Sequence, residues 1–284
     1  MKTFNDFINE GLESEKNIRI VIVGTIDLNK DLLSKERAKK YKGLFDDISF
    51  IFKESDIVIG NLLNNFGGDL SNGDDSSYID DDFAEALKEL GFTHISICNR
   101  NLYTNGVASS QRTIEILEKA GIIVLSPGKT DININGYSID ILTYTSKVDK
   151  NIKGLSDIPN RDIETAKTNN VISIAYPFWT KTRSHKDLSK YIDKSISLKN
   201  KGYNVVAGCG IPNLNKIELI EDNIIMPSLG NFLSGRVDNT KGTIIVTEFL
   251  EEKINKVIEY NIDTTQEESD YFVKYLERNI IKII

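Results

Sequence analysis

The sequence contains few histidines and cysteines, two residue types that commonly bind metals or perform catalysis. Its two histidines, His94 and His185, lie far apart, and its two cysteines, Cys98 and Cys209, form no Cys-x-x-Cys pair. This spacing indicates neither a zinc finger nor a disulfide framework, and we expect two small buried thiols rather than a soft-metal or redox pair. A further candidate is Arg100, because a planar guanidinium can bind a phosphate or a carboxylate through two parallel hydrogen bonds.

Three other patterns have a simpler structural explanation. The acidic stretch "GGDLSNGDDSSYIDDD" could place Asp74, Asp75 and Asp80 around a calcium ion, but the spacing differs from that of an EF-hand loop, so we expect a solvated loop. No serine lies in a Gly-x-Ser-x-Gly turn, which argues against a serine hydrolase. Phe178 and Trp179 end a predicted strand, where aromatic residues usually pack in the core rather than stack on a sugar.

The elements that would position these residues follow from hydrophobic periodicity. Apolar, β-branched runs alternate with helical patterns, which is typical of an α/β fold. The predicted helices, with apolar residues three and four apart, lie within 32–54, 81–91, 109–121 and 186–202. The predicted strands are 18–24, 56–62, 94–99, 122–127, 137–145, 171–176, 204–208, 223–229, 242–250 and 254–262. Because the last three strands follow one another directly, we expect stacked sheets flanked by helices rather than one doubly wound sheet.

Length and composition limit the classes of protein that need to be considered. The chain has 284 residues, of which 40% are hydrophobic and 27% are charged, enough to bury the core of one large domain. No apolar run reaches the roughly 20 residues of a membrane helix, and the N-terminus lacks the apolar segment of a secretory signal. We therefore expect a soluble, cytoplasmic protein with no membrane partner. The net charge of -7 also argues against nucleic acid as a partner.

Six segments, taken in order, resemble one known family. They are "IVIVGTIDL", "FKESDIVIGNLL", "ALKELGFTHISICNRNLYTNGVASSQRTIEILEKAGI", "VISIAYPFW", "KNKGYNVVAGCGIP" and "IIMPSLGNF", which fall between about residues 18 and 235. Their order and spacing are similar to those of the poly-gamma-glutamate capsule biosynthesis (CapA) family, whose members have a calcineurin-like metallophosphatase fold. The resemblance implies an αββα sandwich, in which stacked mixed β-sheets lie between helices.

The resemblance also implies a site for two metal ions, held at strand ends by aspartate, asparagine, glutamate and histidine. Most of the corresponding positions carry other residue types in this chain. Thr25 stands where the family has the aspartate of Gly-Asp, and Leu63 where it has the glutamate of Asn-Leu-Glu. The Asn-Asn-His triplet corresponds to Asn99, Arg100 and Asn101, and the histidine of His-Trp-Gly to Tyr176 or Pro177. The three histidines of Gly-His-His-Pro-His correspond to Cys209, Gly210 and Pro212.

Few features of the family site are retained. Asn61 and Asn99 keep the family's residue type, and "PSLGNF" keeps the closing frame with Asn231. His94 begins a predicted strand and His185 lies in a polar stretch, so neither replaces a missing ligand. We therefore expect the metal centre to be lost, with no catalytic residue, no metal and no cofactor.

Two roles are open for the altered site. In the first, Thr25, Asp27, Asn61, Asn99 and Arg100 form a non-catalytic pocket for an anionic or sugar ligand. In the second, which we favour, Arg100 pairs with a carboxylate such as that of Asp27 and fills the space of the metal. Both describe a CapA-like, non-catalytic protein of the capsule biosynthesis type. The alternative is an active, metal-dependent hydrolase of capsule polymer or phosphoester.

The two ends of the chain add further expectations. Residues 1–16 are predicted to form an amphipathic leader or helix, because Phe4, Phe7, Ile8 and Leu12 would share one face. This segment also resembles the leaders that the prohead protease of large tailed phages removes, here after Glu10 or Glu15. That resemblance implies an alternative role as a virion-associated structural protein with a protein partner. Residues 17–262 are expected to form the CapA-like domain, and residues 263–284 an amphipathic C-terminal helix.

Overall fold

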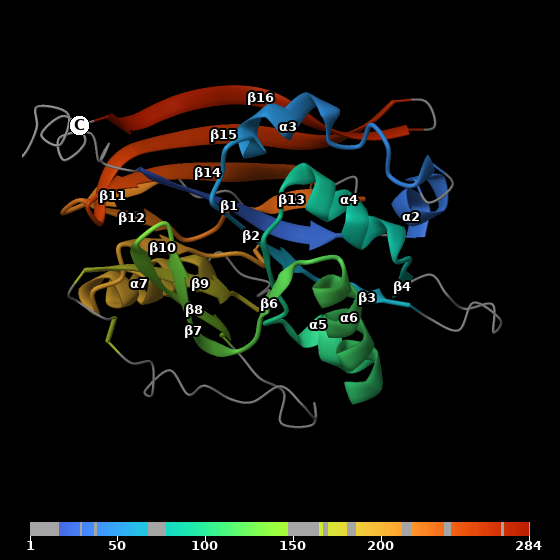
Figure 1. The fold of residues 1–284 in the computed structure, drawn as a ribbon, viewed down its shortest axis with the longest axis horizontal. Helices are drawn as coiled ribbons and strands as arrows, with labels where there is room; N and C mark the ends of the chain where they lie inside the picture. The colour runs from blue at the N-terminus through green and yellow to red at the C-terminus, as the bar shows by residue number, and fades with distance from the viewer. Residues whose placement is uncertain are drawn as a thin grey trace, which may run out of the picture.

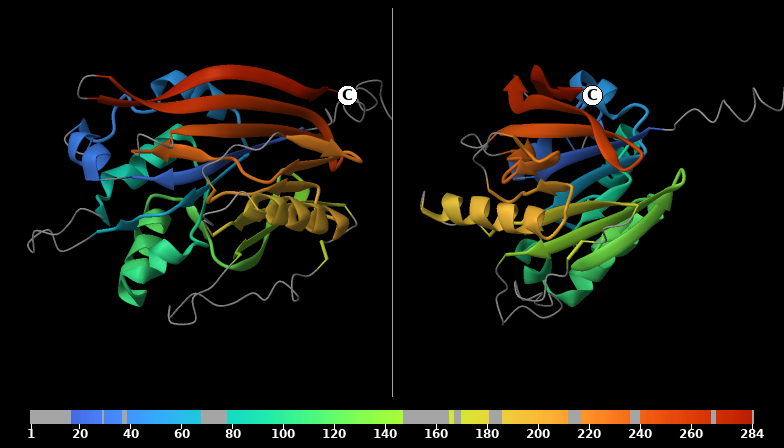
Figure 2. Two further views of the ribbon diagram at one scale, coloured as in Figure 1. Left: turned by 180° about the vertical axis from the view of Figure 1, so that it is seen from behind. Right: turned by 90° about the vertical axis from the view of Figure 1, so that its left-hand side faces the viewer.

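Two stacked β-sheets form the centre of the molecule, and helices cover the outer face of each sheet (Figure 1). The computed structural model describes residues 17–28, 30–36, 39–67, 78–146, 165–166, 170–180, 186–211, 217–235, 240–267 and 270–283. Figure 2 shows the two sheets from behind and from one side, with helices on both outer surfaces. This architecture confirms the predicted αββα sandwich.

The larger sheet has eight strands in the order β16-β15-β14-β1-β2-β5-β6, with β13 placed beside β1. Strands β1, β2, β5 and β6 run parallel, and β14, β15 and β16 form an antiparallel meander on one side of them. The strand bounds are β1 (Ile18–Asp27), β2 (Ile57–Leu62), β5 (His94–Ser96), β6 (Ile123–Leu125), β13 (Asn231–Ser234), β14 (Lys241–Leu250), β15 (Lys253–Glu267) and β16 (Asp270–Ile283).

The smaller sheet has six strands in the order β11-β12-β10-β9-β8-β7. Its four central strands are parallel and its two edge strands are antiparallel to their neighbours. The strand bounds are β7 (Gly128–Ile134), β8 (Tyr137–Thr145), β9 (Val171–Phe178), β10 (Val205–Ala207), β11 (Glu218–Ile220) and β12 (Asn223–Met226). A short parallel pair, β3 (Asn65–Phe66) and β4 (Tyr78–Ile79), lies apart from both sheets.

Helices lie on the outer surface of each sheet. They are α2 (Lys30–Glu36), the 3-10 turn η2 (Asp46–Ile48), α3 (Ser49–Phe52), α4 (Asp82–Leu90), α5 (Arg100–Thr104), α6 (Val107–Lys119) and α7 (Lys186–Asn200). Phe83 and Leu87 of α4 pack in the core between the larger sheet and the helices on its outer face. Tyr191 and Leu198 of α7 pack in the corresponding core of the smaller sheet. Trp179 is fully buried beside Tyr191, which confirms a packing role instead of a sugar platform.

The alternation of side chains along β1 explains why this strand is apolar throughout. Ile18, Ile20 and Ile22 face the core between the two sheets, whereas Val21 and Val23 face the core beneath the helices. Successive residues of a strand point to opposite faces, so a strand that is buried on both faces has a continuous apolar run. Burial of each such side chain contributes roughly 1.5–3 kcal/mol, and a one-residue slip would exchange the two faces.

The predicted C-terminal helix is wrong. Residues 263–267 continue β15 and residues 270–283 form β16, which pairs antiparallel with β15 along most of its length. Tyr271 and Val273, two residues apart, are both buried, as expected for one face of a strand. The segment satisfies helical and strand periodicity at once, and pairing with β15 decides between them. The predicted boundary after residue 262 therefore falls inside β15.

The other elements agree with the sequence more closely. Each of the ten predicted strands coincides with a strand of the structure, although β3, β4, β7, β11 and β13 were not predicted. The predicted helical region 32–54 is divided into α2, η2 and α3, because Lys40 and Tyr41 adopt positive φ angles of 52° and 60° between them. The predicted leader or helix at residues 1–16 lies outside the described residues.

Candidate functional site

The predicted site residues gather where parallel strands of both sheets end. In the larger sheet Thr25 is in register with Asn61 and with Asn231, and Asn61 is in register with Ser96. Parallel neighbours end at the same edge of a sheet, so these registers bring residues from four strands into one row. The smaller sheet contributes Tyr176 of β9 and the residues that follow β10 and β12.

Two asparagines form the first half of the site. The Asn99 side-chain amide donates to the Asn61 side-chain oxygen at 3.3 Å and to the Leu62 carbonyl at 2.7 Å. The Asn61 side-chain amide donates in turn to the Ser96 hydroxyl at 3.1 Å. The Asn99 side-chain oxygen accepts from the Leu102 amide at 3.1 Å and so caps the start of α5. Both asparagines are fully buried, and their side-chain oxygens accept hydrogen bonds from within the protein.

Thr25, Tyr176 and Cys209 form the second half, across the gap between the sheets. The Tyr176 hydroxyl donates to the Val23 carbonyl at 2.8 Å, and the Gly210 amide donates to the Thr25 hydroxyl at 3.0 Å. All three side chains are 1% exposed or less. The arrangement is an uncharged hydrogen-bonded contact that holds the ends of β1 and β9 together.

The two cysteines also lie at this junction, and both are protonated near neutral pH. Burial raises the pKa of the Cys98 thiol to about 12, although hydrogen bonds with Thr143 and Ser96 act in the opposite direction. Burial likewise raises the pKa of the Cys209 thiol, the nearby Cys98 adds to this effect, and a hydrogen bond with Tyr176 opposes it. Because metals and electrophiles react with the thiolate, these cysteines are poor ligands and poor nucleophiles.

The "PSLGNF" segment closes the site through close backbone contacts. The Thr25 amide donates to the Gly230 carbonyl at 3.0 Å, and a Cβ atom on Gly24 would collide with that carbonyl. The Ser228 hydroxyl donates to the Ile211 carbonyl at 2.6 Å, and Asn231 is only 6% exposed. The segment therefore acts as a structural clamp between β1 and the smaller sheet.

The described residues at the junction do not fit the ligand set of a dinuclear metal centre. Such a centre needs several carboxylate or imidazole ligands around each ion. Within the part of the chain that the structure describes, no group of three or more His, Cys, Asp or Glu side chains is placed to hold a metal ion. The positions that point into the junction carry hydroxyl, amide and protonated thiol groups, which are weak ligands for divalent ions.

His94 lies away from the junction, as expected. His94 begins β5, is 3% exposed, and its Nδ1 atom lies 2.8 Å from the Thr93 hydroxyl. Burial lowers the pKa of His94 to about 4, and the charge of Lys88 acts in the same direction. His185 lies outside the described residues.

The structure brings together six of the predicted positions and leaves others apart or undetermined. Thr25, Asn61, Asn99, Tyr176, Cys209 and Asn231 line the junction. Asp27 ends β1 half-buried, and Asn101 is exposed on α5. The Arg100 side chain lies outside the described residues, so neither its anion pocket nor its ion pair with Asp27 is tested. The same holds for Asp74 and Asp75 of the acidic loop and for Pro212.

Sequence reasoning missed two buried polar residues at the junction, Ser96 and Thr143. Ser96 accepts from Asn61, and the Thr143 hydroxyl donates to the Ser126 carbonyl at 2.7 Å. A polar residue inside an otherwise apolar strand was the available signal, since such groups are buried only with hydrogen-bond partners. The contact of Tyr176 with β1 joins two sheets and had no sequence signal.

The fold is metallophosphatase-like, and the comparison with family models identifies the family of the chain. The model for bacterial capsule synthesis protein PGA_cap matches residues 19–236. The chain therefore belongs to this family, which confirms the resemblance seen in its motifs.

Two solved structures are similar to this chain at low sequence identity. A proposed 5′-nucleotidase from Staphylococcus aureus, solved in complex with alpha-ketoglutarate, is 10% identical with a TM-score of 0.50, over 95% of this chain and 55% of that chain. A hypothetical protein from Thermus thermophilus is 14% identical with a TM-score of 0.48, over 93% of this chain and 99% of that one. No curated protein matches the sequence. Among the described helices, none is long and apolar enough to span a bilayer.

Proposed function

We propose that this member of the capsule synthesis family has lost its dinuclear metal centre and acts as a non-catalytic binding protein. The observation that carries the proposal is the buried, uncharged network of Asn61, Asn99, Thr25, Tyr176 and Cys209 at the strand ends. A metal centre requires charged ligands and open coordination positions. The polar atoms of these side chains instead form hydrogen bonds with one another and with backbone groups.

Inserting divalent ions into this network would be costly. Each buried donor or acceptor that lost its partner would cost about 1–3 kcal/mol, and an ion without charged ligands would bear a much larger desolvation penalty. Deprotonation of Cys98 or Cys209 to a charged ligand would not remove this cost, because burial raises the pKa of both thiols and makes the thiolate unfavourable. We therefore propose that the junction serves to hold the two sheets together.

An assay of hydrolysis tests the non-catalytic part of the proposal. The purified chain is incubated with a phosphoester or with poly-gamma-glutamate, in the presence and absence of added manganese. We expect the rate to equal that of buffer in both cases. A rate that depends on manganese and disappears in Asn99→Ala would contradict the proposal and restore the alternative of an active hydrolase.

The ligand that we propose is anionic or a sugar, bound at the rim of the junction and not inside it. Asn101 is exposed on α5, and Arg100, which adds a cation, directly precedes it in the sequence; Asp27 is half-buried at the end of β1. Inorganic phosphate and poly-gamma-glutamate serve as probes in a thermal-shift titration. We expect stabilisation that is lost in Arg100→Gln and kept in Arg112→Gln, which removes an arginine from α6. If the probes stabilised Arg100→Gln and Arg112→Gln to the same extent, the result would refute a ligand site at Arg100.

A further inference from the structure

An open cavity lies on the outer face of the larger sheet, between residues 40–49 and α4. Its volume is about 420 Å³, and it is called the α4 pocket. Cavities of roughly 300–1,000 Å³ are the size in which proteins bind small molecules. Phe45 and Leu90 of the pocket belong to the core under the helices of the larger sheet. The pocket and the smaller sheet therefore lie on opposite faces of the larger sheet.

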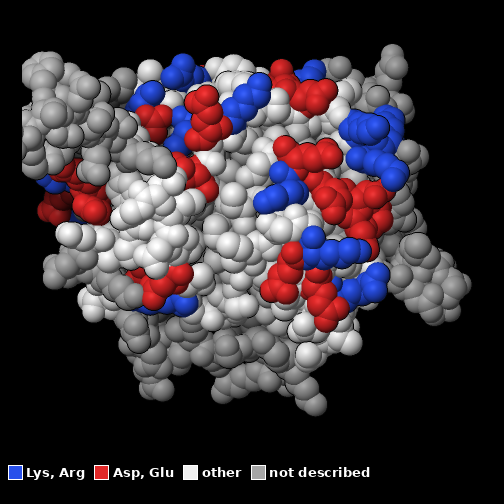
Figure 3. Space-filling view, viewed as in Figure 1, with Lys and Arg blue, Asp and Glu red and all other residues white. Residues whose placement is uncertain are grey.

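Two walls of the pocket carry opposite charges. Lys40 and Lys42 line the first wall, which is formed by the chain between α2 and η2. Glu89 lines the second wall with Ala86 and Leu90, which lie on the same face of α4 because they are spaced three and four residues apart. Figure 3 shows basic and acidic side chains close together over α4, to the right of the centre of the view. A ligand in this pocket therefore meets charges of both signs.

Some of these charged groups have no partner within the described part of the chain. The Lys40 ammonium group lies 3.3 Å from the Asp82 carboxylate, in an ion pair at the start of α4. Among the described residues, no ion pair involves Lys42, Asp46 or Glu89. The Lys42 ammonium group can therefore donate to a ligand, and the Asp46 and Glu89 carboxylates can accept from one.

The first wall is held in a strained conformation. Lys40 and Tyr41 adopt positive φ angles of 52° and 60°, which are unfavourable for residues with a Cβ atom. The Tyr41 hydroxyl donates to the Asp80 carboxylate at 2.9 Å, and its ring packs edge-on against Phe83 with centroids 4.8 Å apart. Strain of this kind persists only where surrounding contacts enforce it, and it is concentrated at ligand sites. The wall is therefore formed before a ligand binds.

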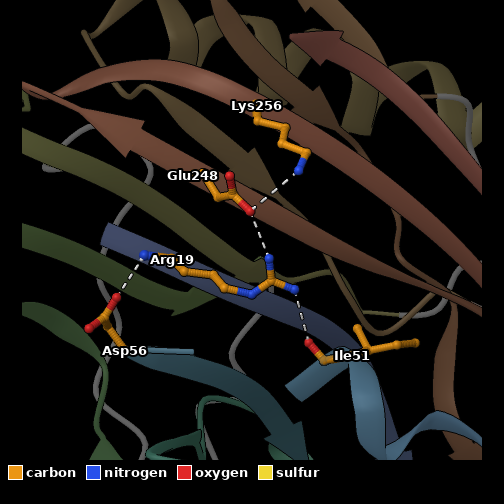
Figure 4. Close-up of polar contacts among 5 residues, drawn as sticks. All are labelled: Arg19, Ile51, Asp56, Glu248 and Lys256. Atoms are coloured by element: carbon orange, nitrogen blue, oxygen red, sulfur yellow. Dashed lines mark hydrogen bonds and ion pairs between the residues drawn. The ribbon is translucent and has the colours of Figure 1, made fainter. Parts of the chain in front are cut away.

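A third side of the pocket is fixed by a polar network centred on Arg19 (Figure 4). The Arg19 guanidinium donates to the Ile51 carbonyl of α3 at 3.3 Å and to the Glu248 carboxylate of β14 at 2.7 Å. The Lys256 ammonium group lies 3.8 Å from the same carboxylate. Because α3 is fixed to the sheet in this way, Ser49 at its start lines the pocket at a defined position.

The base of the pocket is apolar. Phe45 is 7% exposed and Leu90 8%, so each presents only a small apolar surface to the pocket. The Phe45 ring stacks on Phe232 of β13, with centroids 5.7 Å apart, and this contact fixes the base to the core. An apolar group of a ligand would displace water from this surface, which favours binding.

We propose that the α4 pocket binds a free amino acid with an apolar side chain. The carboxylate of the ligand pairs with Lys42, and its ammonium group pairs with Asp46 and Glu89. Its side chain covers Phe45 and Leu90. A phosphate ion fits this pocket poorly because two carboxylates would repel it, and a sugar would leave all three charges without a partner.

Titration of the intact chain with L-leucine, followed by saturation-transfer nuclear magnetic resonance, tests the proposal. We expect a dissociation constant of about 1 mM, because ion pairs at an exposed site are weak. Two analogues each lack one charge: L-leucinamide lacks the carboxylate, and 4-methylpentanoate lacks the ammonium group. Each analogue should bind at least about threefold more weakly than leucine.

Variants connect each charge of the ligand with one wall. Lys42→Met should weaken binding of leucine at least about threefold without weakening that of leucinamide. Glu89→Gln should weaken binding of leucine without weakening that of 4-methylpentanoate. The matched controls Lys53→Met and Glu85→Gln alter exposed residues outside the pocket and should bind leucine like the unaltered chain. Arg100→Gln should also retain leucine binding, since the pocket is separate from the junction.

Three results would overturn the proposal. One is the absence of saturation transfer to leucine at concentrations well above the expected dissociation constant. Another is equal binding of leucine and its two analogues, since apolar contact alone would then hold the ligand. The third is a loss of leucine binding in Lys42→Met that Lys53→Met reproduces, because the effect would then come from the net charge of the chain and not from the pocket.

Discussion

Acidification should destabilise this protein through one histidine. Burial lowers the pKa of His94 from 6.5 to about 4, and its Nε2 atom has no hydrogen-bond partner in the structure. Between these two values the unfolded chain binds a proton that the folded chain does not, so the free energy of unfolding decreases as the pH falls through this window. Each pKa unit corresponds to 1.36 kcal/mol, which gives a loss of about 3 kcal/mol below pH 4 and about 2 kcal/mol near pH 5.

Urea denaturation near pH 8 and pH 5 measures this loss. Carboxylates also titrate in part of this range, so the informative quantity is the difference between variants. His94→Gln should reduce the pH dependence of the unfolding free energy by about 2 kcal/mol over this interval. His185→Gln serves as the comparison variant, because it removes the other histidine and leaves His94 in place.

The reasoning would be refuted if His94→Gln and the unaltered chain lost the same stability on acidification. A second measurement does not depend on the stability of the variant. The imidazole signals of His94 in the intact folded chain, followed by nuclear magnetic resonance, should remain those of the neutral ring at pH 5.5. A midpoint near 6.5 for this residue would show that burial does not suppress its protonation.

Three further predictions concern the junction of the two sheets. Gly24→Ala should destabilise the fold by about 3 kcal/mol or more in chemical denaturation, because the added methyl group would collide with the Gly230 carbonyl; a loss below 1 kcal/mol would contradict this contact. Asn99→Ala should cost about 2–3 kcal/mol, since it removes a helix cap and leaves a buried carbonyl without its donor, and a neutral result would argue against the network. Neither Cys98 nor Cys209 should react with an aromatic disulfide reagent in the folded protein at pH 8, and rapid labelling before unfolding would contradict their burial and raised pKa values.

The sequence predicts the central strands well because they are buried on both faces. A continuous run such as "IRIVIVG" has no other stable environment in a chain of this composition. The C-terminal segment is different, because Tyr271 and Val273 fit a strand while the surrounding apolar residues also fit a helix. This segment forms a strand because it pairs with β15. Such pairing with another strand cannot be predicted from the spacing of apolar residues within the segment alone.

The position of the site at the strand ends could be predicted from the sequence, but the contacts between its residues could not. Its residues lie at the ends of predicted strands, where the family resemblance implied one site, and Asn61 and Asn99 do approach each other. The contacts that close the junction depend on how the sheets stack. The hydrogen bond from Tyr176 to the Val23 carbonyl is one of them, and periodicity along either strand cannot predict it.

The metal content of the purified chain is the most direct test of the central claim. The protein is incubated with manganese, zinc and iron, desalted thoroughly and measured by plasma mass spectrometry. The neutral network at the strand ends predicts retention far below one ion per chain. One or two ions retained per chain, and released by Asn99→Ala, would mean that this junction still holds a metal centre and that the protein is to be reconsidered as an enzyme.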